Sequence, residues 1–247
     1  MHALTAHDIV HIWETGLTQG PVDKALTLLS RAQPDMSVAE LTEMTIGQRD
    51  DRLLAVRESL FGSRIGCYYE CPNCGQRFEF YVEAAAIRSG GNSAGRGGDL
   101  VHEIAAEGYT LRFRLVNSRD IAAVAMCKDR EAGRALLIDR CLLEARLDGE
   151  RISPAELPEP ILAELDARMA ECDPLAEVLF NLDCLKCGKS WKVYFDVGDF
   201  LWTEIAAQAR RLLSEIHVLA ATYGWREADI LALSARRRQF YLEMIGA

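Results

Sequence analysis

Two Cys-x-x-Cys pairs constrain the fold of this chain more than any other feature of its sequence. Cys71 and Cys74 form the first pair, and Cys184 and Cys187 form the second. The segments around the pairs align with each other without gaps, YYECPNCGQRFEFYVE at 68–83 on NLDCLKCGKSWKVYFD at 181–196. In both segments a glycine follows the second cysteine, and apolar residues then alternate as in a strand. The repeat predicts two equivalent β knuckles.

The knuckles have the spacing of a zinc site. A gap of two residues lets both thiolates of one turn bind the same ion at about 2.3 Å, and two such turns complete a tetrahedron. Gly75 and Gly188 allow the tight backbone whose N–H groups point at sulfur. We therefore expect one zinc ion with four ligands, namely Cys71, Cys74, Cys184 and Cys187. Because no position is left for water or substrate, the zinc is expected to be structural.

The two pairs are separated by more than a hundred residues, where a compact zinc ribbon has far fewer. The cost of loop closure grows by only about 0.6 kcal/mol per doubling of length, whereas a structural zinc supplies roughly 10 to 16 kcal/mol of apparent binding free energy. Lys186, Lys189 and Arg77 are expected to offset part of the negative charge of four thiolates. Two turns with reduced thiols and no metal remain the alternative.

Composition limits the classes of protein that this chain can belong to. The 247 residues are 49% hydrophobic and 26% charged, which is typical of a globular protein with a sizeable core. A formal charge of −9 disfavours nucleic-acid binding, and no apolar run is long enough to span a membrane. The first residues lack a secretion signal, so we expect a cytoplasmic protein whose eight cysteines are reduced.

We expect an α+β fold that is predominantly helical, with a zinc-ribbon-like four-Cys site formed by two β knuckles and an inserted α+β subdomain. Hydrophobic periodicity and helix-capping residues divide the chain into six parts. In chain order these are an N-terminal helical unit (1–62), a first zinc knuckle and strand (63–88), a flexible Gly/Ser loop (89–98), an inserted α+β unit (99–180), a second zinc knuckle and strand (181–197) and C-terminal helices (198–247).

Individual helix boundaries are also predicted. Pro21 and Thr45 are expected to begin helices, and residues 121–147 read as helical sequence up to the turn at Asp148-Gly149. A long amphipathic helix is expected at 200–223, with Gly224 ending it. Ser234 is expected to cap a last helix whose exposed first turn carries Arg236, Arg237 and Arg238.

The motifs of known enzyme classes are incomplete here. His7 and His11 have the i, i+4 spacing of zinc proteases, but Asp8 replaces the glutamate that such enzymes need. The glycine-rich stretch SGGNSAGRGG lacks the Gly-Lys-Ser/Thr ending of a phosphate loop, and there is no Gly-x-Ser-x-Gly elbow. We expect a non-enzymatic protein with no catalytic residues and no small-molecule substrate.

Several segments together carry a resemblance to a known family. They are LTEMTIGQRDDRLL (41–54), RESLFG (57–62), the two knuckles, NSRD (117–120), YGW (223–225), ILALS (230–234) and RQFYL (238–242). In these segments the chain resembles the baseplate proteins of contractile phage tails and phage-derived contractile injection systems, a family that includes the small baseplate hub assembly factors of T-even phages. It is longer than those factors and has the paired knuckles and the inserted unit in addition.

The resemblance implies a baseplate component or an assembly factor whose partners are baseplate hub, spike or tail-tube proteins. Trp202, Trp225 and Tyr241 are candidates for docking on such a partner, with packing in the core as the alternative. The competing class is a zinc-ribbon nucleic-acid-binding or transcription accessory protein, which predicts a basic face around the knuckles. The local charges are instead mixed, with Glu70, Glu79, Glu83, Asp183 and Asp196 beside Arg77, Lys186, Lys189 and Lys192.

Overall fold

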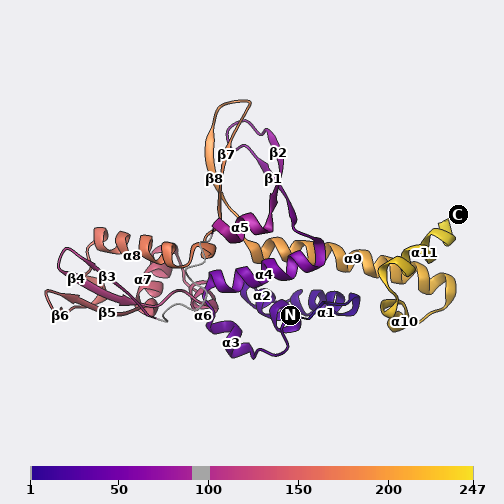
Figure 1. The fold of residues 1–247 in the computed structure, drawn as a ribbon, viewed down its shortest axis with the longest axis horizontal. Coiled ribbons are helices and arrows are strands. Elements are labelled where there is room, and N and C mark those ends of the chain that lie inside the picture. Colours follow the sequence, from indigo (N-terminus) through magenta and orange to yellow (C-terminus); the bar gives the residue numbers. More distant parts are fainter. Residues whose placement is uncertain (1, 91–100, 247) are drawn as a thin grey trace. The chain divides into compact units, whose positions relative to one another are not determined.

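The computed structural model describes residues 2–90 and 101–246, and it confirms an α+β fold that is mostly helical (Figure 1). The chain forms two compact units, one from residues 1–38 with 197–247 and the other from residues 39–196. The predicted Gly/Ser loop at 89–98 lies outside the described residues, apart from Ser89 and Gly90 at the end of a helix. In the described part of the chain, no helix is both long and apolar enough to cross a membrane.

The first unit is entirely helical. Within residues 2–38 and 197–246, its helices are α1 (Ala6–Gly16), α2 (Pro21–Ala32), α9 (Val197–Tyr223), α10 (Glu227–Ala232) and α11 (Ala235–Gly246). The central helix α9 buries one stripe of apolar residues against the other helices, consisting of Leu201, Ile205, Leu212, Ile216 and Leu219. Gly224 ends this helix with a φ of 69°, as its position in the sequence predicted.

The helices predicted together at 1–62 divide between the two units. Helices α1 and α2 pack on α9, whereas α4 (Ile46–Phe61) belongs to the second unit, preceded there by α3 (Val38–Glu43). Hydrophobic periodicity shows that a helix has an apolar face, but it does not name the element that covers this face. Thr45 caps α4 with a capping box, as predicted.

The C-terminal helix corrects one expectation. Arg236 and Arg237 are exposed in the first turn of α11 as predicted, but Arg238 is buried, with only 3% of its surface exposed. Its Nε donates to Glu215 Oε2 on α9 at 2.9 Å, and another guanidinium nitrogen donates to the carbonyl of Leu233 at 2.6 Å. A buried arginine with these partners joins α11 to α9.

The second unit contains a four-stranded antiparallel sheet in the order β3-β4-β5-β6. Its strands are β3 (His102–Ala106), β4 (Tyr109–Phe113), β5 (Leu142–Leu147) and β6 (Glu150–Arg151). The first two form a hairpin, and Asp148-Gly149 forms the predicted turn with positive φ at both residues. Helix α8 (Glu159–Cys172) covers one face of the sheet, and the core between them contains Leu111, Phe113, Leu142, Ala145, Leu157, Ile161 and Leu165.

Strand β5 falls in the stretch 121–147 that was predicted to be helical. The helical part of this stretch comprises α6 (Ser118–Val124) and α7 (Arg130–Cys141), and the chain then pairs with β4. Residues 142–147 (LLEARL) favour a helix by themselves, so pairing in the sheet overrides a local preference.

A buried carboxylate fixes the beginning of α6. Asp120 is fully buried and accepts two hydrogen bonds from Arg114, at 2.6 and 2.9 Å, and one from Arg140 at 2.7 Å. It also accepts from the backbone N–H of Asn117, whose side chain caps the helix in return. Burial alone would raise the pKa of Asp120, but these donors outweigh it and lower the pKa to about 2.

Two further hairpins of the second unit contain the cysteine pairs. The first consists of β1 (Arg64–Glu70) and β2 (Arg77–Glu83), and α5 (Ala84–Gly90) follows it. The second consists of β7 (Leu179–Asp183) and β8 (Ser190–Tyr194). The sequence predicted β2 and β8 but not their partners β1 and β7. Short 3-10 helices at Pro154–Glu156 and Pro174–Ala176 complete the unit, the second of them packing on α4.

Candidate metal centre

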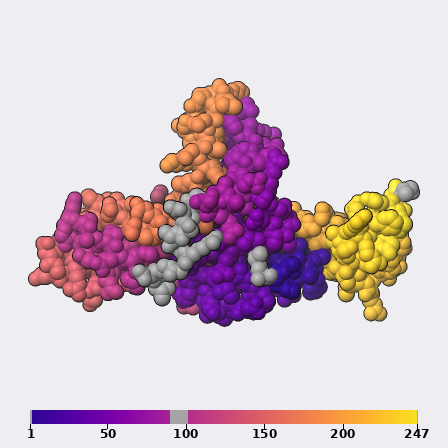
Figure 2. Space-filling view, viewed as in Figure 1, coloured from indigo at the N-terminus to yellow at the C-terminus, as the bar shows by residue number. Residues whose placement is uncertain are grey.

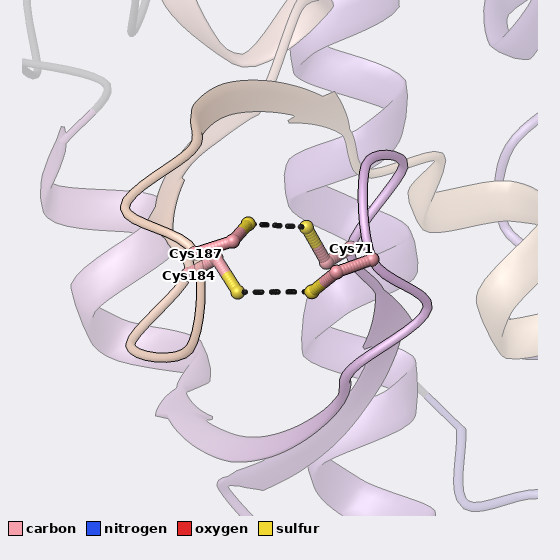
Figure 3. A group of neighbouring side chains, drawn as sticks. Cys71, Cys184 and Cys187 are labelled. Atoms are coloured by element: carbon pink, nitrogen blue, oxygen red, sulfur yellow. Dashed lines mark hydrogen bonds between the residues drawn. The ribbon is translucent and has the colours of Figure 1, made fainter.

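The tips of the two hairpins bring the four predicted cysteines together (Figure 3). The Sγ atoms of Cys71 and Cys187 are 3.7 Å apart, and those of Cys74 and Cys184 are 3.6 Å apart. All four Sγ atoms lie within 4.8 Å of one another. Because both of these contacts join one hairpin to the other, an ion at this position would hold the hairpins together.

The sulfur spacing fits a tetrahedral zinc ion. Four ligands at the zinc–thiolate distance of about 2.3 Å form a tetrahedron with edges of about 3.8 Å. The distances between sulfurs of different hairpins, 3.6 and 3.7 Å, are close to this edge and far longer than a disulfide bond, and all the cysteines are free. The four thiols can therefore hold one zinc ion.

Each cysteine pair lies in a tight turn of the same form. In the first turn the Gly75 N–H donates to the Cys71 carbonyl at 2.9 Å, and in the second the Gly188 N–H donates to the Cys184 carbonyl at 2.8 Å. Both glycines have left-handed backbones, with φ of 66° and 70°. A side chain would be strained at either position, which explains the glycine that follows each pair.

Hydrogen bonds to sulfur favour the ionised form of Cys187. The Asn73 side chain and then the Lys189 backbone N–H are the largest influences, and they lower the pKa of Cys187 to about 6. The Gln76 N–H likewise favours the Cys74 thiolate, but burial and the three neighbouring sulfurs outweigh it and raise that pKa to about 12. One thiol thus ionises easily and the next resists, because adjacent thiolates repel each other. A divalent cation removes this repulsion.

Asn73 is a site residue that the sequence analysis missed. It lies between the two cysteines of the first turn, yet its side chain is the largest influence that lowers the pKa of Cys187 in the second. Its place inside the Cys-x-x-Cys loop was the available signal in the sequence, because an amide side chain there can reach sulfur.

One of the positive charges expected to offset the four thiolates already has a partner. Arg77 Nε pairs with Glu70 Oε1 at 3.0 Å.

Aromatic side chains hold the two hairpins against each other below the cysteines. The rings of Phe78 and Trp191 meet edge to face with centroids 5.6 Å apart, and those of Phe80 and Phe180 do so at 5.7 Å. Phe195 extends the cluster, with its ring 5.3 Å from that of Phe180. Figure 2 shows the two hairpins in contact along their length. The apolar alternation noted in the sequence is therefore the surface through which the hairpins pair.

The cluster is closed at its base and open at its tip. Cys71 and Cys184 are each 2% exposed, Cys74 is half-buried and Cys187 is exposed. Leu185, at the outermost turn, is 96% exposed. The first cysteine of each pair is thus the more deeply buried ligand.

The remaining cysteines and the histidine pair lie outside the site. Cys67 is buried in β1, and Cys141 is buried at the end of α7, where its thiol points to Asp120. His7 and His11 are exposed on α1 with their rings stacked at 6.4 Å. Among the residues that the structure describes, the four cysteines are the one group of three or more potential ligands close enough to share an ion.

Comparison of the chain with protein-family models, with curated proteins and with solved structures gave no match. The functional argument therefore depends on the residues themselves.

Proposed function

We propose that this protein is a non-enzymatic assembly adaptor of a contractile phage tail or phage-derived injection system, either a baseplate component or an assembly factor of the hub or spike. One structural zinc ion holds its two hairpins together. The observation that carries the proposal is the four-sulfur cluster, which joins segments more than a hundred residues apart in the chain.

The chemistry of the cluster supports a structural rather than a catalytic metal. A catalytic zinc keeps a coordination position for water or substrate, whereas four thiolates fill the tetrahedron. The ion would fasten two hairpins that also contact each other through aromatic rings. Such an arrangement provides a rigid projection of the second unit, which suits a protein that binds other proteins.

Segments that carry the family resemblance meet one another in the second unit. Thr45, in the segment 41–54, forms a β-bridge with Asn117, the first residue of the segment 117–120. The Asn117 side chain donates to Glu43 at 3.1 Å, and the Ile46 N–H donates to the carbonyl of Val116 at 3.0 Å. The two segments are therefore in contact in the folded protein. This contact supports treating them together as one signature of the baseplate family.

The C-terminal segments of the resemblance also meet. The rings of Tyr223 and Trp225 are stacked with centroids 4.7 Å apart, and Tyr241 contacts Trp225 edge to face at 4.9 Å. All three are partly exposed, so they combine packing with an accessible aromatic surface. Aromatic residues of this kind are enriched where proteins bind each other.

The zinc part of the proposal is tested by metal analysis of protein purified without chelator. We expect one zinc per chain in the wild type and in Cys172→Ser, whose cysteine is in α8 away from the cluster. Cys184→Ser should lose most of the zinc. A wild-type content well below one would contradict the metal.

The adaptor part is tested separately, by purifying the tagged protein from its native cell and then repeating the binding with isolated partners. Direct binding of a baseplate hub, spike or tail-tube protein is the expected result. Binding of polymerase, ribosome or nucleic acid, with salt-sensitive affinity, would instead support the zinc-ribbon nucleic-acid-binding or transcription accessory protein.

A further inference from the structure

Helix α11 is held firmly on one side and left uncovered on the other. Its inner side carries Arg238, bonded to Glu215, and Tyr241, which contacts Tyr223 and Trp225. The opposite side is the α11 outer face, which we define as six residues, Arg236, Arg237, Gln239, Phe240, Glu243 and Met244. Figure 1 shows α11 at the C-terminal end of the first unit, after α9 and α10.

The outer face exposes apolar side chains at a spacing of one helical turn. Phe240 is 60% exposed and Met244 is 47% exposed. An open hollow runs beside Phe240, and its lining includes Arg236, Arg237 and Glu243. Large apolar groups that stay in contact with water on a rigid helix mark a surface suited to burial against a partner.

The charges of the outer face are arranged symmetrically about Phe240. Arg237 precedes it by three residues and Glu243 follows it by three. Since each helical residue turns about 100°, the two charges lie about 60° to either side of Phe240, at opposite ends of the face. Arg236 and Met244 have the same relation at a spacing of four residues.

This symmetry makes the face complementary to itself. A twofold axis through Phe240, perpendicular to α11, places Arg237 of one copy over Glu243 of the other, and the reverse pair forms at the same time. The same rotation lays the aliphatic stem of Arg236 on Met244 and brings the two Phe240 rings together at the axis. Arg237, Glu243 and the apolar centre thus find matching groups, and the Arg236 guanidinium stays in water at the edge of the contact.

We propose that the α11 outer face binds the same face of a second copy of this chain, with the two helices antiparallel. A purely acidic peptide would match Arg236 and Arg237 but would be repelled by Glu243. A purely basic peptide would match Glu243 but would be repelled by the two arginines. A second copy satisfies both ends. This charge complementarity selects the partner, although each chain has a net charge of −9 that weakens the association.

The dimer is expected to be weak. The helix has 12 residues, and a helix of this size is about 18 Å long. A contact between two such helices buries less than the roughly 1,200 Å² of a standard stable interface, so association belongs to the transient class. It is therefore measured by sedimentation equilibrium over a concentration series that reaches the submillimolar range.

The test exchanges the charges of the pair in the full-length, zinc-loaded protein. Arg237→Glu and Glu243→Arg each place like charges opposite each other, and each should weaken the dimer by about tenfold or more. An equimolar mixture of the two variants should restore association, because every pair then has opposite charges. Arg210→Glu, an exposed reversal on α9, is the matched control and should leave the dimer unchanged.

Circular dichroism and thermal unfolding identify any variant that fails to fold, and Phe240→Ala offers a neutral change that should also weaken association. Concentration-dependent dimers in the wild type, with rescue in the mixture, would support the proposal. A wild type that stays monomeric, or a dimer that ignores both charge reversals, would overturn it. The wild type could also stay monomeric and bind a different baseplate protein that the Phe240→Ala variant no longer binds. This result would assign the α11 outer face to that protein and would overturn the proposed dimer.

Discussion

Removing a single buried cysteine should release the two hairpins from each other. In Cys184→Ser the ligand is lost from a site whose facing sulfurs lie 110 and 116 residues apart in the chain. A cross-link that closes a loop of about 100 residues contributes about 4.7 kcal/mol by restricting the unfolded chain. Part of this is offset because the intervening sheet folds by itself, so we expect a loss of about 3 to 4 kcal/mol in the free energy of opening the hairpins.

The aromatic contacts determine how far the damage extends. The ring pair of Phe78 and Trp191 and that of Phe80 and Phe180 remain, and each such pair contributes about 0.5 to 1.5 kcal/mol beyond its area burial. The hairpins should therefore open more often while β4 and its sheet keep their own core. Destabilisation is expected to be local.

Amide hydrogen exchange measures this directly. A change of about 3 to 4 kcal/mol corresponds to exchange in β2 and β8 that is faster by on the order of a hundred- to a thousandfold, whereas amides of β4 should change little. Cys172→Ser is the control, because it makes the same chemical change in α8. Complete loss of zinc with unchanged exchange in β2 and β8 would refute the inference that the metal holds the hairpins together.

Three further predictions concern residues that support the two units. Arg238→Ala should cost about 1.5 to 3 kcal/mol of unfolding free energy because it removes the hydrogen bond between a buried guanidinium and Glu215, which keeps a 3.5 Å contact with Arg211, whereas Arg237→Ala on the exposed side should be nearly neutral for folding in denaturant titration. Gly16→Ala should cost about 1 to 3 kcal/mol, since its Cβ would lie 2.1 Å from an indole carbon of α9, whereas Gly246→Ala meets nothing within 4 Å. For Asp120, whose folded pKa is about 2 and therefore below the ordinary 3.8, the stabilisation should be complete above pH 4 and lost as pH falls toward 2, a change of about 2 kcal/mol.

Each of these has an outcome that would contradict it. Equal stability of Arg238→Ala and Arg237→Ala would show that the buried arginine does not join α11 to α9. An unaltered melting temperature in Gly16→Ala would mean that the indole moves aside at no cost. Acid unfolding of Asp120→Asn with the same slope as the wild type between pH 4 and 2 would remove Asp120 from the acid response.

The local elements and the cysteine site are largely determined by the sequence alone. The Cys-x-x-Cys turns, the glycines after them and the apolar alternation in β2 and β8 depend on residues close together in the chain. Helix ends at Thr45 and Gly224 follow from backbone geometry that a few neighbouring residues impose. These features were therefore predicted at the right residues.

Tertiary structure decided which surfaces meet. It grouped α1 and α2 with α9, turned residues 142–147 into a strand beside β4, and buried Arg238 against Glu215. It also brought Asn73 near enough to Cys187 in the other hairpin to lower the pKa of that thiol. In each case the deciding partner is distant in sequence, and periodicity identifies an apolar or polar face without naming what covers it. Pairing energy between distant residues then outweighs local preference.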